Sequence, residues 1–200
     1  MLLNVHKWRL TGWRDVVALV CLSLALYHGA GVAVIEAKAA LAPVLIEEAW
    51  QRTLAETRPG ARPWPWADTW PVGRLQAPTL SVDLPVLASD SGNALAFAPG
   101  HALQSAPLGA AGLAVIGGHR DTHFRFLRDL KVGSPLRIQL PDSSWREYRV
   151  VATGVVDSRT QGWSAETQDQ QEALLLVTCY PFDALRPNSP LRYLVRAEPA

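Results

Sequence analysis

Three side chains in the C-terminal half of the chain are of types that could carry out covalent chemistry together. Cys179 ends an apolar stretch, His119 follows two glycines, and Arg192 lies beyond the cysteine. A thiolate is a strong nucleophile, but a free cysteine has a pKa of about 8.5 and needs an imidazole or a cation nearby to ionise at neutral pH. A guanidinium can stabilise the negative charge that develops on an attacked carbonyl oxygen. The three side chains therefore suit nucleophilic attack on an amide.

Each of these residues also has an ordinary structural interpretation. A lone cysteine on an apolar strand is commonly a small buried hydrophobe. His119 could be a turn residue, and Arg192 could be a solvated strand residue. Residue type alone therefore leaves both interpretations open.

Four further residues could take part in the chemistry or have a structural role. Thr178 could orient a substrate, although a β-branched residue on a strand needs no such role. Asp121 could orient the predicted base, but it is better suited to cap a short helix predicted over residues 122–130. His101 and His123 are rival bases, and a general base has to be chosen by geometry first.

Short β-prone segments dominate the chain after residue 73. They cover residues 74–80, 82–87, 113–116, 136–140, 148–156, 174–179 and 191–196. Turn-forming residues separate nearly all of them, which predicts an antiparallel barrel or sandwich. Residues at the ends of different strands can then converge over one cleft.

An uncharged apolar segment occupies residues 16–35. About 20 helical residues match the hydrocarbon core of a membrane. Lys7, Arg9 and Arg14 precede the segment, which predicts a cytoplasmic N-terminus and an extracytoplasmic remainder. A cleaved signal peptide, with small residues at 37 and 39, is the alternative, but the length of the apolar segment favours a retained anchor.

The chain divides into three predicted parts. Residues 1–57 form a cytoplasmic tail, the anchor and a helix that continues beyond it, with a kink at Pro43. Residues 58–73 form a connector rich in proline and tryptophan. Its tryptophans could lie at the membrane interface or pack on the folded domain. Residues 74–200 form the catalytic domain.

Composition excludes some classes of function. The formal net charge is +1, from 19 basic and 18 acidic side chains, which disfavours binding to nucleic acid. Cys21 lies in the apolar segment and cannot reach Cys179 to form a disulfide. The sequence has no spaced His/Cys cluster of the kind that zinc needs, so we expect neither a metal nor another cofactor.

Two local motifs and one further residue resemble the sortase family. They are Gly-His-Arg-Asp-Thr-His-Phe at residues 118–124, Leu-Val-Thr-Cys-Tyr-Pro-Phe at 176–182, and Arg192. The likeness is greatest to the class D-like sortases of Gram-negative bacteria, whose Pro-Trp-Pro-Trp-Ala-Asp-Thr-Trp connector is matched at residues 63–70. It covers about residues 63–196. The chain departs from the pattern Thr-Leu-x-Thr-Cys at Leu175, which replaces the first threonine.

The resemblance implies a fold, a reaction and a location. It implies an eight-stranded β-barrel with short helices, in which Cys179, His119 and Arg192 are catalytic. Cys179 would attack the Thr–Gly bond of an LPxTG-like sorting signal on a surface or exported protein, and an amine acceptor would resolve the thioester. The enzyme would be a single-pass protein of the inner membrane with a periplasmic catalytic domain.

Two other classes of function compete with this interpretation. Other cysteine acyl-transferases and proteases are disfavoured, because the His-Gly-Cys, Cys-Gly-Ser-Cys-Trp and Gln-Ala-Cys signatures are absent. A membrane-tethered β-barrel binding module would explain the anchor and the strands without catalysis. If the protein is such a binding module, Cys179→Ala should retain all activity. If it is the enzyme, Cys179→Ala should lose activity completely.

Overall fold

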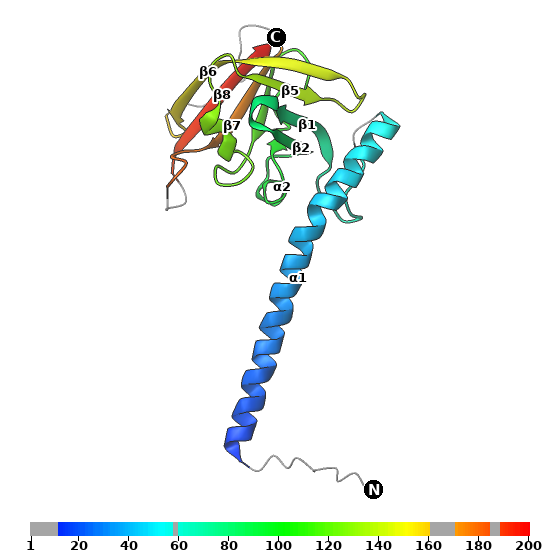
Figure 1. Cartoon of the computed structure of the whole chain (residues 1–200), viewed down its shortest axis with the longest axis vertical. Coiled ribbons are helices and arrows are strands. Elements are labelled where there is room, and N and C mark those ends of the chain that lie inside the picture. Colours follow the sequence, from blue (N-terminus) through cyan, green and yellow to red (C-terminus); the bar gives the residue numbers. More distant parts are fainter. Residues whose placement is uncertain (1–11, 58–59, 161–170, 185–188) are drawn as a thin grey trace. The chain divides into compact units, whose positions relative to one another are not determined.

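The computed structural model describes residues 12–57, 60–160, 171–184 and 189–200. The chain forms two compact units, Met1–Leu41 and Ala42–Ala200. The predicted fold class is confirmed: the second unit is mainly β, its strands close into a barrel, and an apolar helix precedes them (Figure 1).

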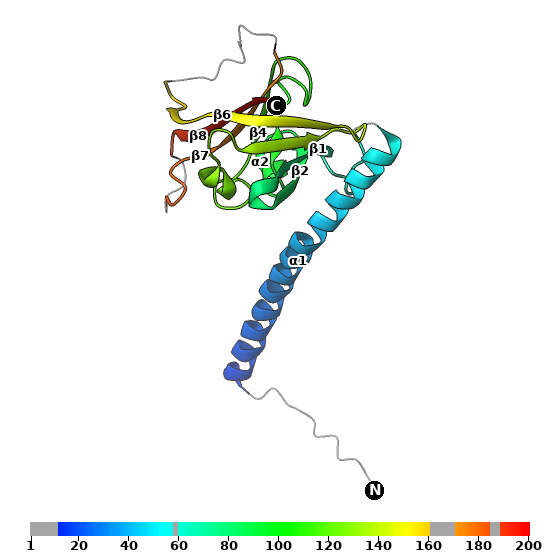
Figure 2. The ribbon, with the colours of Figure 1, turned by 45° about the horizontal axis from the view of Figure 1, so that its top comes forward.

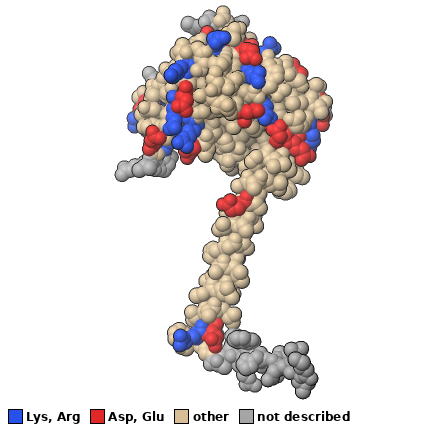
Figure 3. Space-filling view, in the orientation of Figure 1, with Lys and Arg blue, Asp and Glu red and all other residues tan. Residues whose placement is uncertain are grey.

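Helix α1 (Trp13–Glu56) contains the predicted membrane anchor. Its most apolar window of 18 residues has a mean hydropathy of 2.0, and none of that window is buried. Figure 3 shows a long stretch of this helix without a charged side chain on the face in view. By length and composition, therefore, α1 is able to cross a membrane, although a signal sequence would satisfy the same criteria.

The strands of the barrel are joined in the order β1-β2-β3-β4-β7-β8-β6-β5, and β5 pairs with β1 to close it. Their bounds are β1 (Pro71–Ala77), β2 (Val82–Ala88), β3 (Gly100–His101), β4 (Leu113–Gly117), β5 (Pro135–Gln139), β6 (Trp145–Asp157), β7 (Ala173–Cys179) and β8 (Leu191–Pro199). Strands β7 and β8 run side by side, with β6 beyond β8 (Figure 2).

Two strand pairs depart from the predicted antiparallel arrangement. Strands β2 and β3 are parallel, and so are β4 and β7. A parallel pair needs a long crossover, and the chain between β4 and β7 supplies one that contains β5 and β6. The antiparallel prediction is therefore wrong for β4 and β7, the pair that carries the two motifs.

The helix predicted over residues 122–130 is shorter in the structure. The 3₁₀ helix η2 (Arg125–Asp129) follows a turn, and the other short helices are η1 (Pro78–Leu80) and α2 (Gly92–Leu95). Phe124, Leu127 and Leu130 are all buried in the barrel core. A spacing of three residues matches the period of the 3₁₀ helix that forms here.

Strand β7 is apolar along its whole length because both of its faces are covered. Leu174 and Leu176 belong to the barrel core, whereas Ala173, Leu175 and Val177 belong to a second cluster on the opposite, outer face. A strand buried on both faces reads as a continuous apolar run.

The last turns of α1 belong to the barrel unit. The buried residues Ala42, Ile46, Ala49, Trp50 and Thr53 recur on one face, and the helix continues through Pro43. Ile46 packs in a cluster with Leu87, Ala94 and Ala98. The compact unit thus begins well before the predicted catalytic domain, and β1 begins at Pro71, inside the predicted connector.

The connector tryptophans do not all behave alike. Trp64 packs edge to face on Phe97, with ring centroids 5.3 Å apart. Trp66 is 81% exposed. Packing on the folded domain therefore accounts for Trp64, and Trp66 remains available to an interface.

Candidate active site

The register of β4 and β7 brings the two predicted motifs to one edge of the barrel. These strands are parallel, with Leu113 opposite Ala173 at one end and Gly117 opposite Val177 at the other. His119 and Cys179 are separated by the same interval in sequence as these pairs. Because the carboxyl ends of parallel strands meet at one edge, the predicted base and nucleophile occupy equivalent positions just beyond the last pair.

Two hydrogen bonds extend this pairing beyond the strands. The Gly118 amide donates to the Val177 carbonyl oxygen at 3.1 Å. The Thr178 hydroxyl donates to the Gly118 carbonyl oxygen at 2.7 Å. The backbone before His119 is therefore tied to the backbone before Cys179.

Gly118 is also required by the packing of an aromatic ring. A Cβ added at this position would lie 2.7 Å from a ring carbon of Phe124, which is fully buried. The Phe124 amide donates to the carbonyl oxygen of His119 at 2.9 Å, which closes a tight turn. The turn from His119 to Phe124 thus packs on the end of the barrel core.

Cys179 is the last residue of β7 and is half-buried. It is a free thiol, as is Cys21. Residues alternate between the two faces of a strand, so Cys179 shares the outer face with Leu175 and Val177. The predicted nucleophile therefore projects from the outside of the barrel and not into its core.

Arg192 is the register partner of Cys179 on β8. Its Nη1 donates to the carbonyl oxygens of Ser189 at 2.6 Å and Leu191 at 2.9 Å. The Tyr180 amide also donates to the Leu191 oxygen, at 3.0 Å. Within the described part of the chain, Nε and Nη2 of Arg192 have no hydrogen-bond partner, so these donors could face a substrate carbonyl.

A second arginine joins the two motifs and was not identified from the sequence. Arg120 Nη2 donates to the carbonyl oxygen of Ala184 at 2.9 Å, from the His119 turn to the loop after Cys179. His119 itself is exposed. An arginine directly after the predicted base was the only sequence signal for this contact.

Asp121 lies in the turn before η2, and the N-cap of η2 is Phe124, without a side-chain hydrogen bond. The capping role predicted for Asp121 is therefore wrong, because the helix begins later in the chain. An orienting role for Asp121 beside His119 stays a prediction.

Thr178 is only 2% exposed and its hydroxyl is bonded to the backbone of Gly118. Its hydroxyl thus joins the backbone before Cys179 to the backbone before His119, and the predicted contact with substrate stays a prediction.

The two rival histidines differ in their surroundings. His101 is 8% exposed, and its Nε2 lies 2.9 Å from the Ala106 carbonyl oxygen and 3.2 Å from the Ser105 hydroxyl. His123 is half-buried near His119: burial lowers its pKa, and the charge of His119 lowers it further. His101 is thus held by structural contacts, whereas His123 belongs to the surroundings of the predicted base.

An aromatic cluster supports the loop that follows Cys179. The rings of Tyr180 and Tyr193 stack at a centroid distance of 6.2 Å, and Phe182 meets Tyr193 edge to face at 5.2 Å. Tyr193 is the register partner of Thr178 on β8. Tyr180 and Phe182 lie within the motif at residues 176–182, but Tyr193 does not. Predicting the cluster would therefore have required the pairing of β7 with β8.

The site has no obvious place for a metal ion. Within residues 12–57, 60–160, 171–184 and 189–200, no three His, Cys, Asp or Glu side chains come together as a ligand set. The chemistry available at this edge is that of a thiol, an imidazole and a guanidinium.

A barrel that carries these groups at the ends of neighbouring strands defines the class of protein. The sortase domain model matches residues 75–200. The chain belongs to the sortase family, whose members are cysteine transpeptidases.

Individual relatives agree with this assignment. The chain is 33% identical over 123 residues to sortase D of Bacillus subtilis (strain 168). The aligned region covers 62% of this chain and 61% of that protein. It resembles the structure of sortase A from Corynebacterium diphtheriae with a TM-score of 0.59, at 26% identity, over 68% of this chain and 63% of that one. Sortase C2 of Group B Streptococcus Pilus Island 1 gives a TM-score of 0.57, at 26% identity, over 65% and 74%. The chain thus spans less than two thirds of the first two relatives.

Proposed function

We propose that this protein is a membrane-anchored cysteine transpeptidase of the class D-like group found in Gram-negative bacteria. In this account it cleaves an LPxTG-like sorting signal between Thr and Gly and transfers the acyl group to an amine. The observation that carries the proposal is the pairing of β4, β7 and β8, which brings His119, Cys179 and Arg192 to one edge. Family membership supports the reaction class.

The chemistry follows from the three groups. The Cys179 thiolate attacks the carbonyl carbon of the scissile Thr–Gly bond, and the free donors of Arg192 stabilise the oxyanion. His119, as imidazolium, protonates the leaving amine, so the C–N bond breaks and a thioester remains. An incoming amine then gives its proton to His119 and displaces the Cys179 thiolate. Water in place of the amine gives hydrolysis.

The location and partners form part of the same proposal. Helix α1 holds the chain in the inner membrane, with the N-terminus in the cytoplasm and the barrel in the periplasm. The donor is a surface or exported protein that bears the sorting signal. Support for the class D-like assignment comes from the identity to sortase D and from the matched connector at residues 63–70.

The experiment uses the full chain in detergent micelles or nanodiscs, because the last turns of α1 pack in the barrel unit. Peptides with LPxTG-type sequences and scrambled controls are incubated with the enzyme, with and without an amine. Mass spectrometry then identifies the cleaved bond and any new amide. We expect cleavage between Thr and Gly, and no product with Cys179→Ala or His119→Ala. A membrane-tethered binding module would instead retain peptide binding in Cys179→Ala and cleave nothing in either form.

A further inference from the structure

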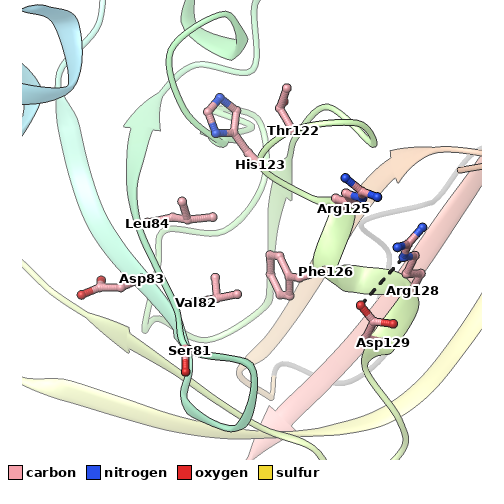
Figure 4. Close-up of a pocket in the computed structure, with 10 residues that line it drawn as sticks. All are labelled: Ser81, Val82, Asp83, Leu84, Thr122, His123, Arg125, Phe126, Arg128 and Asp129. Carbon is pink, nitrogen blue, oxygen red and sulfur yellow. Dashed lines mark ion pairs between the residues drawn. The ribbon is translucent and has the colours of Figure 1, made fainter. Parts of the chain in front are cut away.

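An open cleft of about 490 Å³ lies beside the His119 turn, between β2 and η2. We refer to it as the β2–η2 cleft. Its lining is formed by Ser81, Val82, Asp83, Leu84, Thr122, His123, Arg125, Phe126, Arg128 and Asp129. Figure 4 shows Val82 and Leu84 of β2 on one side, the two arginines on the other, and Phe126 between them. The cleft therefore combines an apolar floor with a basic wall.

The acidic residues of the cleft already have cationic partners. Arg74 donates from Nη2 to Asp83 Oδ2 at 3.1 Å and from Nε to Asp83 Oδ1. Arg128 lies 3.8 Å from Asp129 and 3.7 Å from Asp183. Among the residues that the structure describes, the exposed Arg125 side chain has no hydrogen bond or ion pair. Of the two arginines that line the cleft, Arg125 is therefore the one whose guanidinium is not engaged by a carboxylate of the described residues.

The cleft also adjoins the predicted base. His123 lines it, and the hydrogen bond from the Phe124 amide to the His119 carbonyl oxygen holds His119 and His123 in one tight turn. The lowered pKa of His123, to which the charge of His119 contributes, agrees with this proximity. A molecule in the cleft can thus place one end near His119 and the other near Arg125.

We propose that the β2–η2 cleft receives the amine acceptor and that Arg125 binds a carboxylate which this acceptor carries. The inference depends on the proposed transpeptidase function, which requires an amine but leaves its chemical class open. The acceptor is then an amino acid or short peptide with a free amine and a free carboxylate, and not a neutral amine. Phe126, Val82 and Leu84 would contact its apolar part.

The transfer step balances without any further reactant. The amine nitrogen donates its lone pair to the thioester carbonyl carbon, a C–N bond forms, and the C–S bond breaks. Cys179 leaves as thiolate, and His119 takes the proton that the nitrogen loses. Arg125 takes no part in these bonds and acts only by binding the acceptor.

The test is a competition between triglycine and triglycinamide, which carry the same amine but differ in the carboxylate. Triglycine spans about 10 Å when extended. Full-length enzyme is incubated with an LPxTG-type peptide and an equimolar mixture of the two amines. Mass spectrometry then gives the ratio of the two amide products. Aminolysis of a small thioester by the same mixture supplies the intrinsic ratio.

We expect the wild-type enzyme to favour triglycine about two- to fivefold over the intrinsic ratio, the range that an exposed ion pair supplies. Arg125→Gln should return the ratio to the intrinsic value. Arg146→Gln removes an exposed arginine of β6 that does not line the cleft, and it should keep the wild-type ratio. Because both products come from one thioester, the ratio is independent of the overall rate.

The possible results distinguish a failure of the acceptor assignment from a failure of the proposed transpeptidase function. A wild-type ratio equal to the intrinsic one, an unchanged ratio in Arg125→Gln, or a thioester that only water resolves overturns the acceptor assignment alone. Absence of any Cys179 thioester overturns the proposed function and the acceptor assignment with it.

Discussion

Cys179 and Arg192 face each other across β7 and β8 as register partners. Side chains opposite each other in an antiparallel pair have Cβ atoms about 5 Å apart, so the two side chains begin from neighbouring positions. Arg192 is also held through Nη1 by the carbonyl oxygens of Ser189 and Leu191. The pairing thus puts the predicted nucleophile and the arginine at adjacent backbone positions of β7 and β8.

Replacement of Arg192 by lysine tests whether its planar group is needed. Lysine keeps the charge, but an ammonium that bonds both backbone carbonyls has one N–H left for a substrate, whereas Nε and Nη2 of arginine offer three in a fixed plane. We expect kcat/KM for peptide cleavage to fall about a hundredfold, as when a donor to an oxyanion is removed. Arg196→Lys is the matched control, because Arg196 lies on the same face of β8 and is the register partner of Leu175. Equal losses in both variants would contradict a specific role for Arg192.

The buried Thr178 hydroxyl should stabilise the fold and position His119. Thr178→Val removes the donor to the Gly118 carbonyl oxygen while keeping the shape of the side chain. We expect the free energy of unfolding to fall by about 1–2 kcal/mol, the usual effect of leaving a buried acceptor unpaired. The value of kcat should also fall, and Thr178→Ser should restore most of both. Thermal unfolding and peptide cleavage measure the two effects, and wild-type behaviour of Thr178→Val would refute the positioning role.

The contact between Gly118 and Phe124 predicts a coupled pair of substitutions. Gly118→Ala places a methyl group 2.7 Å from the Phe124 ring, which should lower the free energy of unfolding by about 1–3 kcal/mol. Phe124→Leu alone should also destabilise the protein, because it leaves a cavity in the core. In the double variant the smaller side chain relieves the clash. The double variant should therefore lose less free energy of unfolding than the sum of the two single variants. Strict additivity would contradict the contact.

The lowered pKa of His123 predicts how stability depends on pH. Its ordinary value is 6.5, and burial followed by the charge of His119 lowers it in the folded protein. As the pH falls through 6.5, His123 takes up a proton in the unfolded chain before it does so in the folded protein. The free energy of unfolding is therefore highest above this pH and decreases below it. Between about pH 7.5 and about pH 5, His123→Gln should therefore lose less stability than the wild type.

Nuclear magnetic resonance provides a direct check on this prediction. His119→Gln removes a positive charge near His123, and the pKa of His123 should rise toward its ordinary value. A His123 that titrates at or above its ordinary value in the wild type, or that does not respond to His119→Gln, would contradict the proposed proximity.

Much of the barrel could be predicted from local patterns. The apolar stretch that ends at Cys179 and the apolar segment at residues 16–35 have clear signatures. The first forms β7, and the second lies within the long helix α1. Strand β3 was missed because Gly100 and His101 are too few to form a pattern. The parallel pairing of β4 and β7 was also missed, because a single sequence records which segments are strands but not which strands are neighbours.

The same limit applies to the candidate site. The residue types and the family motifs predicted His119, Cys179 and Arg192, and the register brings their positions to one edge. The contact of Arg120 with Ala184 joins segments far apart in the chain, and its only signal in the sequence was an arginine directly after the predicted base. Asp121 was assigned to a helix cap because aspartate is a preferred N-cap residue and the helix was predicted to begin at residue 122, whereas the N-cap of η2 is the buried Phe124.

The central claim is that Cys179 forms a covalent acyl-enzyme. Its most direct test is the intact mass of the full-length protein after brief reaction with an LPxTG-type peptide under reducing conditions, with the adduct located by peptide mapping. The account predicts a mass increase equal to the peptide up to its Thr residue, carried by Cys179, absent in Cys179→Ala and removed by hydroxylamine. A folded, reduced protein that gains no such mass with any peptide of this type, or that carries it on Cys21, would contradict the account.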